Sequence, residues 1–319
     1  MRPAQHPARQ RGVALIAAIL LVALGTIVAA SIAFNNAMAA RRGTSNLSLD
    51  QSLLVAEAAE ALAAYALRED LRDNPNQDHP HEAWSNRLGP VEVVPGVFLE
   101  AIVEDQHGRF NLNSLVNDDG SVNGDMVEVF RRLLQKLDIE PTWAQLIADW
   151  IDPDIVPLIP DGGEDSLYTA QTPPYRPPNM YITSPSELLA LPGFGRERYL
   201  KLAPYITALP HTAKLNTCSA RGHLLDAMIA DNHEEYGGDP EKLAKNREQG
   251  CFPTKTQYQA SFDAQPDAWQ KMEPYLAETS SYFRLTSIVS IGTSEFALYS
   301  LLLREQGGVR PILRSFAAE

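Results

Sequence analysis

The chain has 319 residues, of which 45% are hydrophobic and 21% charged, a composition typical of a folded protein rather than a disordered one. Its formal net charge of −13 disfavours a general nucleic-acid binder, because an acidic surface repels phosphate backbones. The two cysteines, Cys218 and Cys251, are too few for a zinc ribbon or a four-cysteine iron–sulfur cluster, and they allow one disulfide.

The amino terminus has the pattern of a membrane anchor. Residues 1–12 contain three arginines and no acid, and residues 13–40 contain no charged residue. The apolar run 13–34 is long enough to cross a lipid bilayer as one helix, whereas a secretory signal has a shorter apolar core and a cleavage site after it. We therefore expect a transmembrane helix over 13–34. Positive charges on its two sides are nearly balanced, so they give little information on orientation.

The same helix is expected to continue as an amphipathic segment over 35–70. No proline occurs between Pro7 and Pro75, and residues 47–70 are rich in Ala, Leu and Glu. Glu57, Glu60 and Arg68 are expected to face water, opposite an apolar stripe. The expected stripe consists of Leu53, Leu54, Ala58, Ala61, Leu62 and Tyr65.

A basic leader that ends in Gly12, a hydrophobic helix that begins at Val13 and an amphipathic continuation resemble type IV prepilins and type II secretion pseudopilins. The resemblance implies that a prepilin peptidase cuts between Gly12 and Val13 and that the new N-terminus, Val13, is methylated. Members of the family usually carry Glu at the fifth mature position, where this chain has Ala17.

The absent Glu and the large size make the chain similar to the K minor pseudopilins of type II secretion systems. That resemblance implies a subunit at the pseudopilus tip, which nucleates assembly with the I and J minor pseudopilins above a filament of major pseudopilin and supports protein export across the outer membrane. It also implies a single-pass protein of the bacterial inner membrane, with its globular part in the periplasm.

After the helix, strand-like segments flank a long helical region. Alternating residues predict strands over 91–94 and 97–113, and again over 282–292, 294–304 and 309–316, with a turn at Gly307-Gly308. The expected fold is α+β and pilin-like: a long N-terminal helix and a small antiparallel sheet carry a large, mostly α-helical insertion. The expected parts are the leader 1–12, the helix 13–70, the β domain 71–113 with 280–319, and the inserted domain 114–279.

Residues 149–165 hold the densest group of carboxylates in the chain. Such clusters on turns suit Ca²⁺, which takes about six to eight oxygen ligands, and Gly162-Gly163 lets the backbone fold around an ion. The spacing differs from that of an EF-hand and resembles the calcium-binding loops of K subunits. We predict a structural Ca²⁺ site, with helix caps and a solvated turn as the alternative. The candidate ligands are Asp149, Asp152, Asp154, Asp161, Glu164 and Asp165.

Cys218 and Cys251 are candidates for a disulfide, which would persist only in an oxidising compartment and so favours the periplasm for the region after the anchor. Two free buried thiols are the alternative.

Competing functions have weaker support in the sequence. Residues 188–206 resemble a DNA-binding helix-hairpin-helix, but the region 114–279 carries 14 basic and 25 acidic residues, so no nucleic-acid partner is expected. The common hydrolase and nucleotide-binding motifs are absent, so we expect a subunit that is not an enzyme. The alternatives are a minor pilin of a type IV pilus, a membrane-tethered DNA-uptake receptor, a tethered hydrolase and an ordinary single-pass anchor.

Overall fold

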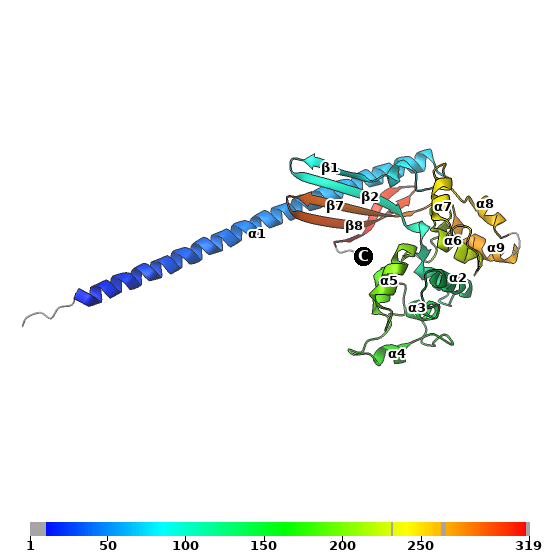
Figure 1. Cartoon of the computed structure of the whole chain (residues 1–319), viewed down its shortest axis with the longest axis horizontal. Helices are drawn as coiled ribbons and strands as arrows, with labels where there is room; N and C mark the ends of the chain where they lie inside the picture. The colour runs from blue at the N-terminus through cyan, green and yellow to red at the C-terminus, as the bar shows by residue number, and fades with distance from the viewer. Residues whose placement is uncertain (1–10, 231, 263–265, 317–319) are drawn as a thin grey trace, which may run out of the picture. The chain divides into compact units, whose positions relative to one another are not determined.

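The computed structural model describes residues 11–230, 232–262 and 266–316. The chain divides into two compact units, residues 1–54 and residues 55–319. The helix α1 (Arg11–Asp73) begins in the first unit and ends in the second, three residues beyond the expected end at Asp70 (Figure 1).

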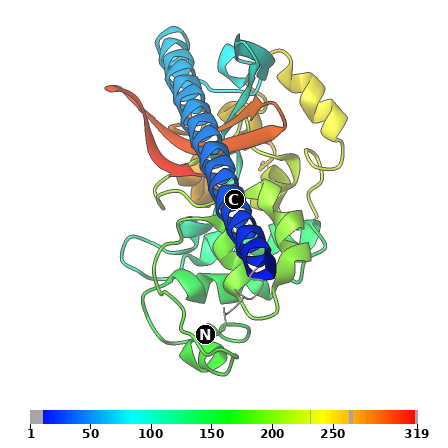
Figure 2. The same cartoon turned by 90° about the vertical axis from the view of Figure 1, so that its left-hand side faces the viewer.

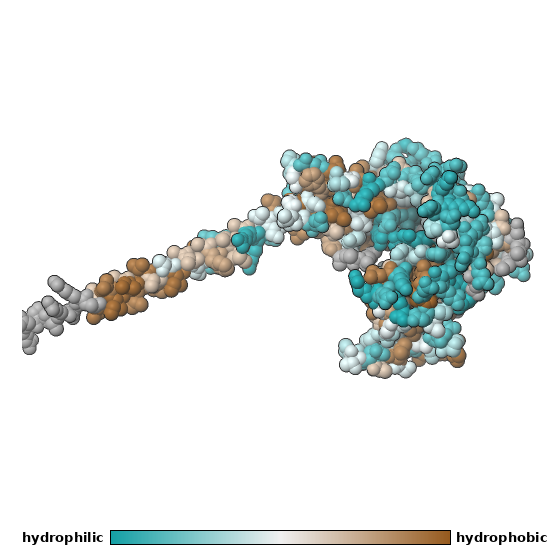
Figure 3. Space-filling view, viewed as in Figure 1, coloured by the Kyte–Doolittle hydropathy of each residue, from teal (hydrophilic) through white to brown (hydrophobic). Residues whose placement is uncertain are grey.

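The first unit contains the apolar part of α1. All side chains of residues 13–34 are exposed, and hydrophobic atoms cover this part of the helix (Figure 3). Within the described residues, α1 is the one helix long and apolar enough to cross a membrane, by length and composition. An exposed apolar surface of this kind fits a transmembrane anchor.

The second unit contains a five-stranded antiparallel sheet with the order β1-β2-β7-β8-β9. The central pairing runs from Val97 opposite Ile291 to Asp105 opposite Phe283, so strands from the two sides of the helical region lie next to each other. This arrangement confirms the α+β, pilin-like expectation. The strands are β1 (Leu88–Val94), β2 (Val97–Asp105), β7 (Tyr282–Ile291), β8 (Ser294–Glu305) and β9 (Gly308–Ser315).

The strand expected over 97–113 is shorter than predicted. It ends at Asp105, whose side chain accepts a hydrogen bond of 2.8 Å from the backbone N–H of His107 and caps a 3-10 turn, η2 (Gln106–Gly108). A side-chain cap of this kind competes with continued strand pairing. The chain therefore leaves the sheet here and enters the helical region.

The expected apolar stripe on the second half of α1 was wrong. Leu54, Leu62 and Tyr65 are each more than half exposed, while Glu60, which was expected to face water, is only 4% exposed. Small side chains let the helix lie close to the sheet, which supplies partners for the buried carboxylate: Arg314 Nη2 lies 2.5 Å from Glu60 Oε2. The residues that α1 does bury are mostly alanines: Ala56, Ala59, Ala63 and Leu67.

The end of α1 is fixed by a buried arginine. Arg304 on β8 donates to Asp70 Oδ2 at 2.9 Å and also pairs with Asp78, and its guanidinium lies 4.7 Å from the centre of the Phe283 ring. Burial raises the pKa of Asp78 to about 6, although the Arg304 charge opposes that change. These contacts tie together the helix, the following loop and the sheet.

The remaining helices lie together in one region beside the five-stranded sheet (Figures 1 and 2). Their apolar residues form one large core, separate from the two small clusters between α1 and the sheet. Two short parallel pairs, β3 (Phe110–Asn111) with β4 (Ile206–Thr207) and β5 (Leu215–Asn216) with β6 (Leu276–Ala277), connect distant parts of this region. The helices are α2 (Gly124–Lys136), α3 (Trp143–Ile151), α4 (Asp165–Thr169), α5 (Gly195–Leu202), α6 (Gly222–Ile229), α7 (Pro240–Arg247), α8 (Lys255–Ala260) and α9 (Pro266–Met272).

Candidate functional site

Three of the predicted metal ligands come together between α3 and α4. Asp149 lies in the last turn of α3, Asp152 directly follows that helix, and Glu164 directly precedes α4. One carboxylate oxygen from each lies within 4.8 Å of the others, and none of the three residues is more than 4% exposed. A group of buried acids this close together needs a positive partner.

The loop between the two helices folds tightly around Asp149. Asp149 Oδ2 accepts hydrogen bonds from the backbone N–H of Leu158 at 3.0 Å and of Gly163 at 2.8 Å. A Cβ atom at Gly162 would lie 2.2 Å from Asp149 Oδ2, so this position has no room for a larger residue. The glycine pair therefore allows the close approach of backbone to carboxylate that the sequence suggested.

Several oxygen atoms in this cluster are buried without a hydrogen-bond donor. They are Asp149 Oδ1, Asp152 Oδ1, both carboxylate oxygens of Glu164 and the side-chain oxygen of Asn179. Buried polar atoms are normally hydrogen-bonded, because leaving one unpaired costs about 1–3 kcal/mol. Carboxylate and amide oxygens that converge without donors are a suitable donor set for a hard cation such as Ca²⁺.

The three clustered acids have raised pKa values in the folded protein. Burial, followed by the charges of neighbouring carboxylates, raises the pKa of Asp152 and of Glu164 to about 7. Burial also raises the pKa of Asp149 to about 6, against the two backbone hydrogen bonds that lower it. The protein alone therefore disfavours the charged forms that a bound cation would favour.

The other predicted ligands lie outside the cluster. Asp154 is exposed and accepts a hydrogen bond of 2.6 Å from Val156 N–H, although its charge still raises the pKa values of the three clustered acids. Asp161 is exposed, and Asp165 lies 3.5 Å from Arg176. The structure thus brings together three of the six predicted acids.

Sequence reasoning missed Asn179. Its Nδ2 donates to the backbone oxygen of Asp154 at 2.6 Å, its Oδ1 is buried beside the carboxylates without a donor, and its φ of 46° is in the left-handed region. Asn tolerates this backbone conformation better than most residues. Its position beyond α4 in a proline-rich segment gives no spacing signal that links it to Glu164.

The predicted disulfide is present between Cys218 and Cys251. Cys218 follows β5 and is fully buried, and Cys251 follows α7, so the bond closes a loop that contains α6 and α7. Cross-linking a loop of this length contributes about 4 kcal/mol in the chain-entropy model.

The helix-hairpin-helix-like segment packs inside the helical region. Gly193 and Gly195 have positive φ values and form the turn before α5. Arg198, a basic residue of this segment, donates to Glu140 Oε1 at 2.6 Å and lies 5.6 Å from the Trp143 ring centre. In this structure the turn holds two helices together.

The predicted cleavage position lies at the start of α1. Gly12 and Val13 are both within this helix, and Ala17 follows one turn later in the exposed apolar segment. Gly12 directly precedes the segment that is expected to enter the bilayer.

The sequence of this chain matches those of known proteins from one family. Residues 108–211 match the family described as "Type II secretion system (T2SS), protein K". The chain is 34% identical to type II secretion system protein K of Pseudomonas aeruginosa, covering 94% of this chain and 90% of that protein, and 32% identical to the protein of Klebsiella pneumoniae, covering 93% of each.

The fold is also similar to a chain in the crystal structure of the GspK–GspI–GspJ complex from enterotoxigenic Escherichia coli. The TM-score is 0.75 at 23% identity, covering 87% of this chain and 100% of that chain. The expected family is confirmed: the chain belongs to the type II secretion system protein K family, the K minor pseudopilins, which are structural components of a secretion system.

Proposed function

We propose that this chain acts by assembly rather than by catalysis, as the subunit at the tip of a type II secretion pseudopilus. In this proposal it nucleates the filament together with the I and J minor pseudopilins and supports protein export across the outer membrane. The observation that carries the proposal is the exposed apolar helix over 13–34 with Ala17 at the fifth position after Gly12. At the tip, no subunit lies above this one to supply an amino terminus. A carboxylate at the fifth position would therefore have no partner there.

The outer face of α1 supports packing against other pseudopilin helices. Leu62 and Tyr65 are more than half exposed on the helix that buries its alanines against the sheet. Exposed large apolar side chains on one helix are a suitable surface for a partner helix. The similar chain from Escherichia coli was solved in a complex named for K, I and J subunits, and we propose the same partners here.

The compartment follows from the anchor and the disulfide. We propose that residues 13–34 span the bacterial inner membrane and that the globular part lies in the periplasm, since a Cys218–Cys251 bond persists in oxidising surroundings.

The proposed processing can be tested by mass. We expect the chain expressed with a prepilin peptidase to lose residues 1–12 and to gain one methyl group on Val13. Gly12→Val should block the cut, while Gly25→Val, at a helix position where a Cβ meets no atom within 4 Å, should not. An unprocessed wild-type chain, or a cut after the apolar run, would contradict the assignment.

Partner choice is tested separately by co-purification with pseudopilins I and J. Recovery of the three-subunit complex is expected with Ala17→Glu as well as with the wild type, but only the wild type should remain confined to the filament tip. Failure to recover either partner, with processing intact, would refute the proposed assembly and leave the leader assignment standing.

We also propose that Asp149, Asp152 and Glu164, together with Asn179, hold a structural Ca²⁺. A bound ion would neutralise the buried carboxylates and fix the loop between α3 and α4. The support is the set of buried oxygens without donors, which lies beside an aromatic pair: the rings of Trp150 and Tyr168 are 5.2 Å apart.

This arrangement offers a direct readout with Tb³⁺, which replaces Ca²⁺ and is excited by nearby aromatic rings. We expect saturable Tb³⁺ luminescence in the full chain, displaced by Ca²⁺ and lost in Glu164→Gln. Asp161→Asn, an exposed acid of the same loop, is the matched control and should bind normally. Equal loss in both variants would argue against this ligand set.

A further inference from the structure

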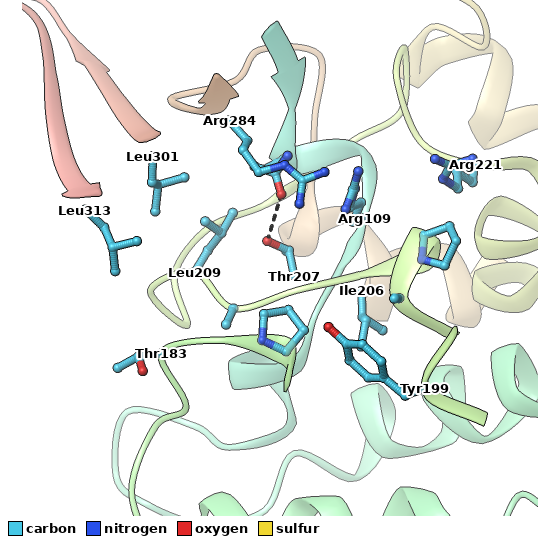
Figure 4. A pocket seen from close by; sticks show the side chains of 15 residues that line it. Arg109, Thr183, Tyr199, Ile206, Thr207, Leu209, Arg221, Arg284, Leu301 and Leu313 are labelled. Atoms are coloured by element: carbon cyan, nitrogen blue, oxygen red, sulfur yellow. Dashed lines mark hydrogen bonds between the residues drawn. The ribbon is translucent and has the colours of Figure 1, made fainter. Parts of the chain in front are cut away.

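A cavity of about 330 Å³ lies on the face of the sheet opposite α1, where the sheet meets the helical region. Side chains of β7, β8 and β9 form one side, and the segment around β4 forms the other (Figure 4). Its size is within the usual range of ligand sites, about 300–1,000 Å³. The cavity is distant in sequence from the proposed metal ligands and shares no residue with them.

Three arginines are the charged residues of its lining, and no carboxylate is among the lining residues. Arg109 follows the turn η2, Arg284 comes from β7, and Arg221 precedes α6. Figure 4 shows the side chains of Arg284 and Arg109 next to each other and that of Arg221 farther along the same wall. In a chain with a formal charge of −13, this concentration of positive charge is local.

The arginines are only partly neutralised by protein groups. Glu104 lies behind the wall, 2.5 Å from Arg284 Nη2 and 3.3 Å from Arg109 Nη2. Arg221 is exposed and lies over the ring of Tyr205, 5.6 Å from its centre. Burial and the Arg284 charge lower the pKa of Arg109 to about 10, which shows that its surroundings disfavour the positive charge. An added anion would relieve this penalty.

A neighbouring cavity of about 310 Å³ shares two of these arginines. Arg109, Arg221 and Arg247 line it together with the carboxylates Glu104 and Asp105, so the lining that holds arginines and no carboxylate is that of the first cavity. The Arg247 guanidinium is held by backbone oxygens: it donates to Phe252 O at 2.7 Å and to Ala220 O at 2.6 Å.

Aliphatic side chains line both sides of the first cavity. Leu301 and Leu313 come from the sheet, and Ile206 and Leu209 come from the segment around β4 (Figure 4). A small inorganic anion would make no contact with these aliphatic side chains, and a purely apolar ligand would place no negative charge beside the guanidiniums of Arg109 and Arg221. The combination fits a ligand that carries a carboxylate next to an apolar side chain.

We propose that this cavity binds an acidic peptide segment of a partner protein, with a carboxylate against Arg109 and Arg221 and a neighbouring apolar side chain against Leu301 and Leu313. A planar guanidinium can donate two parallel hydrogen bonds to the two oxygens of a carboxylate. This match favours a carboxylate over a group that makes a single contact. The inference goes beyond the proposed assembly role and depends neither on leader processing nor on the metal.

The test uses the full chain in a neutral detergent and a rhodamine-labelled peptide of alternating Glu and Leu, followed by fluorescence anisotropy. We expect saturable binding, with a Gln-Leu peptide of the same length binding at least about tenfold more weakly. Inorganic phosphate should compete only poorly, because it makes no contact with the aliphatic side chains.

Arg221→Ala is the informative variant, since this side chain is exposed and the fold should survive its removal. We expect about tenfold weaker binding, and only partial rescue by Arg221→Lys, which keeps the charge but lacks the fork. Arg196→Ala, an exposed arginine outside the cavity, should bind like the wild type, and an unchanged melting temperature shows that each variant is folded.

Three results would overturn the proposal: equal binding of the Glu-Leu and Gln-Leu peptides, unchanged binding by Arg221→Ala, and full displacement by phosphate. The last result would mark a general anion site rather than a peptide site. Each can be obtained with unprocessed chain, so a failure here is distinct from a failure of the proposed pseudopilus assembly.

Discussion

Removal of the proposed cation should destabilise the protein by an amount that the structure lets us calculate. The pKa of Asp152 is about 7 instead of 3.8, and one pKa unit corresponds to about 1.4 kcal/mol, so keeping this carboxylate charged costs up to about 4 kcal/mol. Because the effective dielectric constant around buried groups in proteins is about 20, we take about half of this, about 2 kcal/mol. A ligand present at about 100 times its Kd stabilises by about 2.7 kcal/mol, which is comparable.

The assay is thermal unfolding of the full chain in detergent, followed by circular dichroism, with Ca²⁺ or with EDTA. At about pH 7.5 we expect EDTA to lower the melting temperature by about 4–5 °C. Asp152→Asn should remove most of the difference and should be more stable than the wild type in EDTA, because it deletes a buried charge. Asp161→Asn should behave like the wild type.

The pH dependence gives an independent check on the same cluster. Because the pKa values of Asp149, Asp152 and Glu164 are raised in the folded state, the metal-free protein binds more protons when folded than when unfolded. The contribution of these three acids to stability is therefore fully present below about pH 4 and is lost as the pH rises through about 6–7. Bound Ca²⁺ opposes this loss, so the gap between Ca²⁺ and EDTA should widen from about pH 5 to about pH 7.5. A gap that is absent, or equal at both pH values, would refute the reasoning.

Other positions give equally specific expectations. Arg304→Met should destabilise the protein by about 3–5 kcal/mol, because it leaves the carboxylates of Asp70 and Asp78 buried without their cation. The measurement is the urea midpoint of unfolding, which should fall. A change below about 1 kcal/mol would mean that water replaces the arginine. Replacing Cys218 and Cys251 by Ala should lower the free energy of unfolding by about 4 kcal/mol relative to the oxidised wild type, as measured by urea unfolding. The wild type in reductant should have the same stability as the variant. Gly162→Ala should weaken Tb³⁺ binding by at least about tenfold through its clash with Asp149, whereas Gly124→Ala, where a Cβ meets no atom within 4 Å, should leave binding unchanged.

The amino-acid sequence alone determined the features that depend on local pattern. The transmembrane segment and the three C-terminal strands follow from hydrophobic length and from alternation, and they agree with α1, β7, β8 and β9. The leader, Ala17 and the large insertion were enough to indicate the family, because they are linear features. The sequence limited a disulfide to one pairing, and the structure decided that Cys218 and Cys251 form it rather than remaining free thiols.

Only the tertiary structure decided which polar side chains are buried. Glu60 has the spacing of a solvent-facing residue and becomes buried because β9 brings Arg314 to it. Asp161 and Asp165 look like ligands in the sequence, but the loop directs Asp149, Asp152 and Glu164 inward, and Asn179 joins them from a distant segment.

The arginine cavity shows the same division between local pattern and tertiary contact. Arg109, Arg221 and Arg284 are far apart in the sequence. They meet because the chain leaves the sheet at Asp105 and returns to it at Tyr282, which places the helical region against the open face of the sheet. Burial and long-range pairing depend on contacts between segments, and a one-dimensional pattern does not contain those contacts.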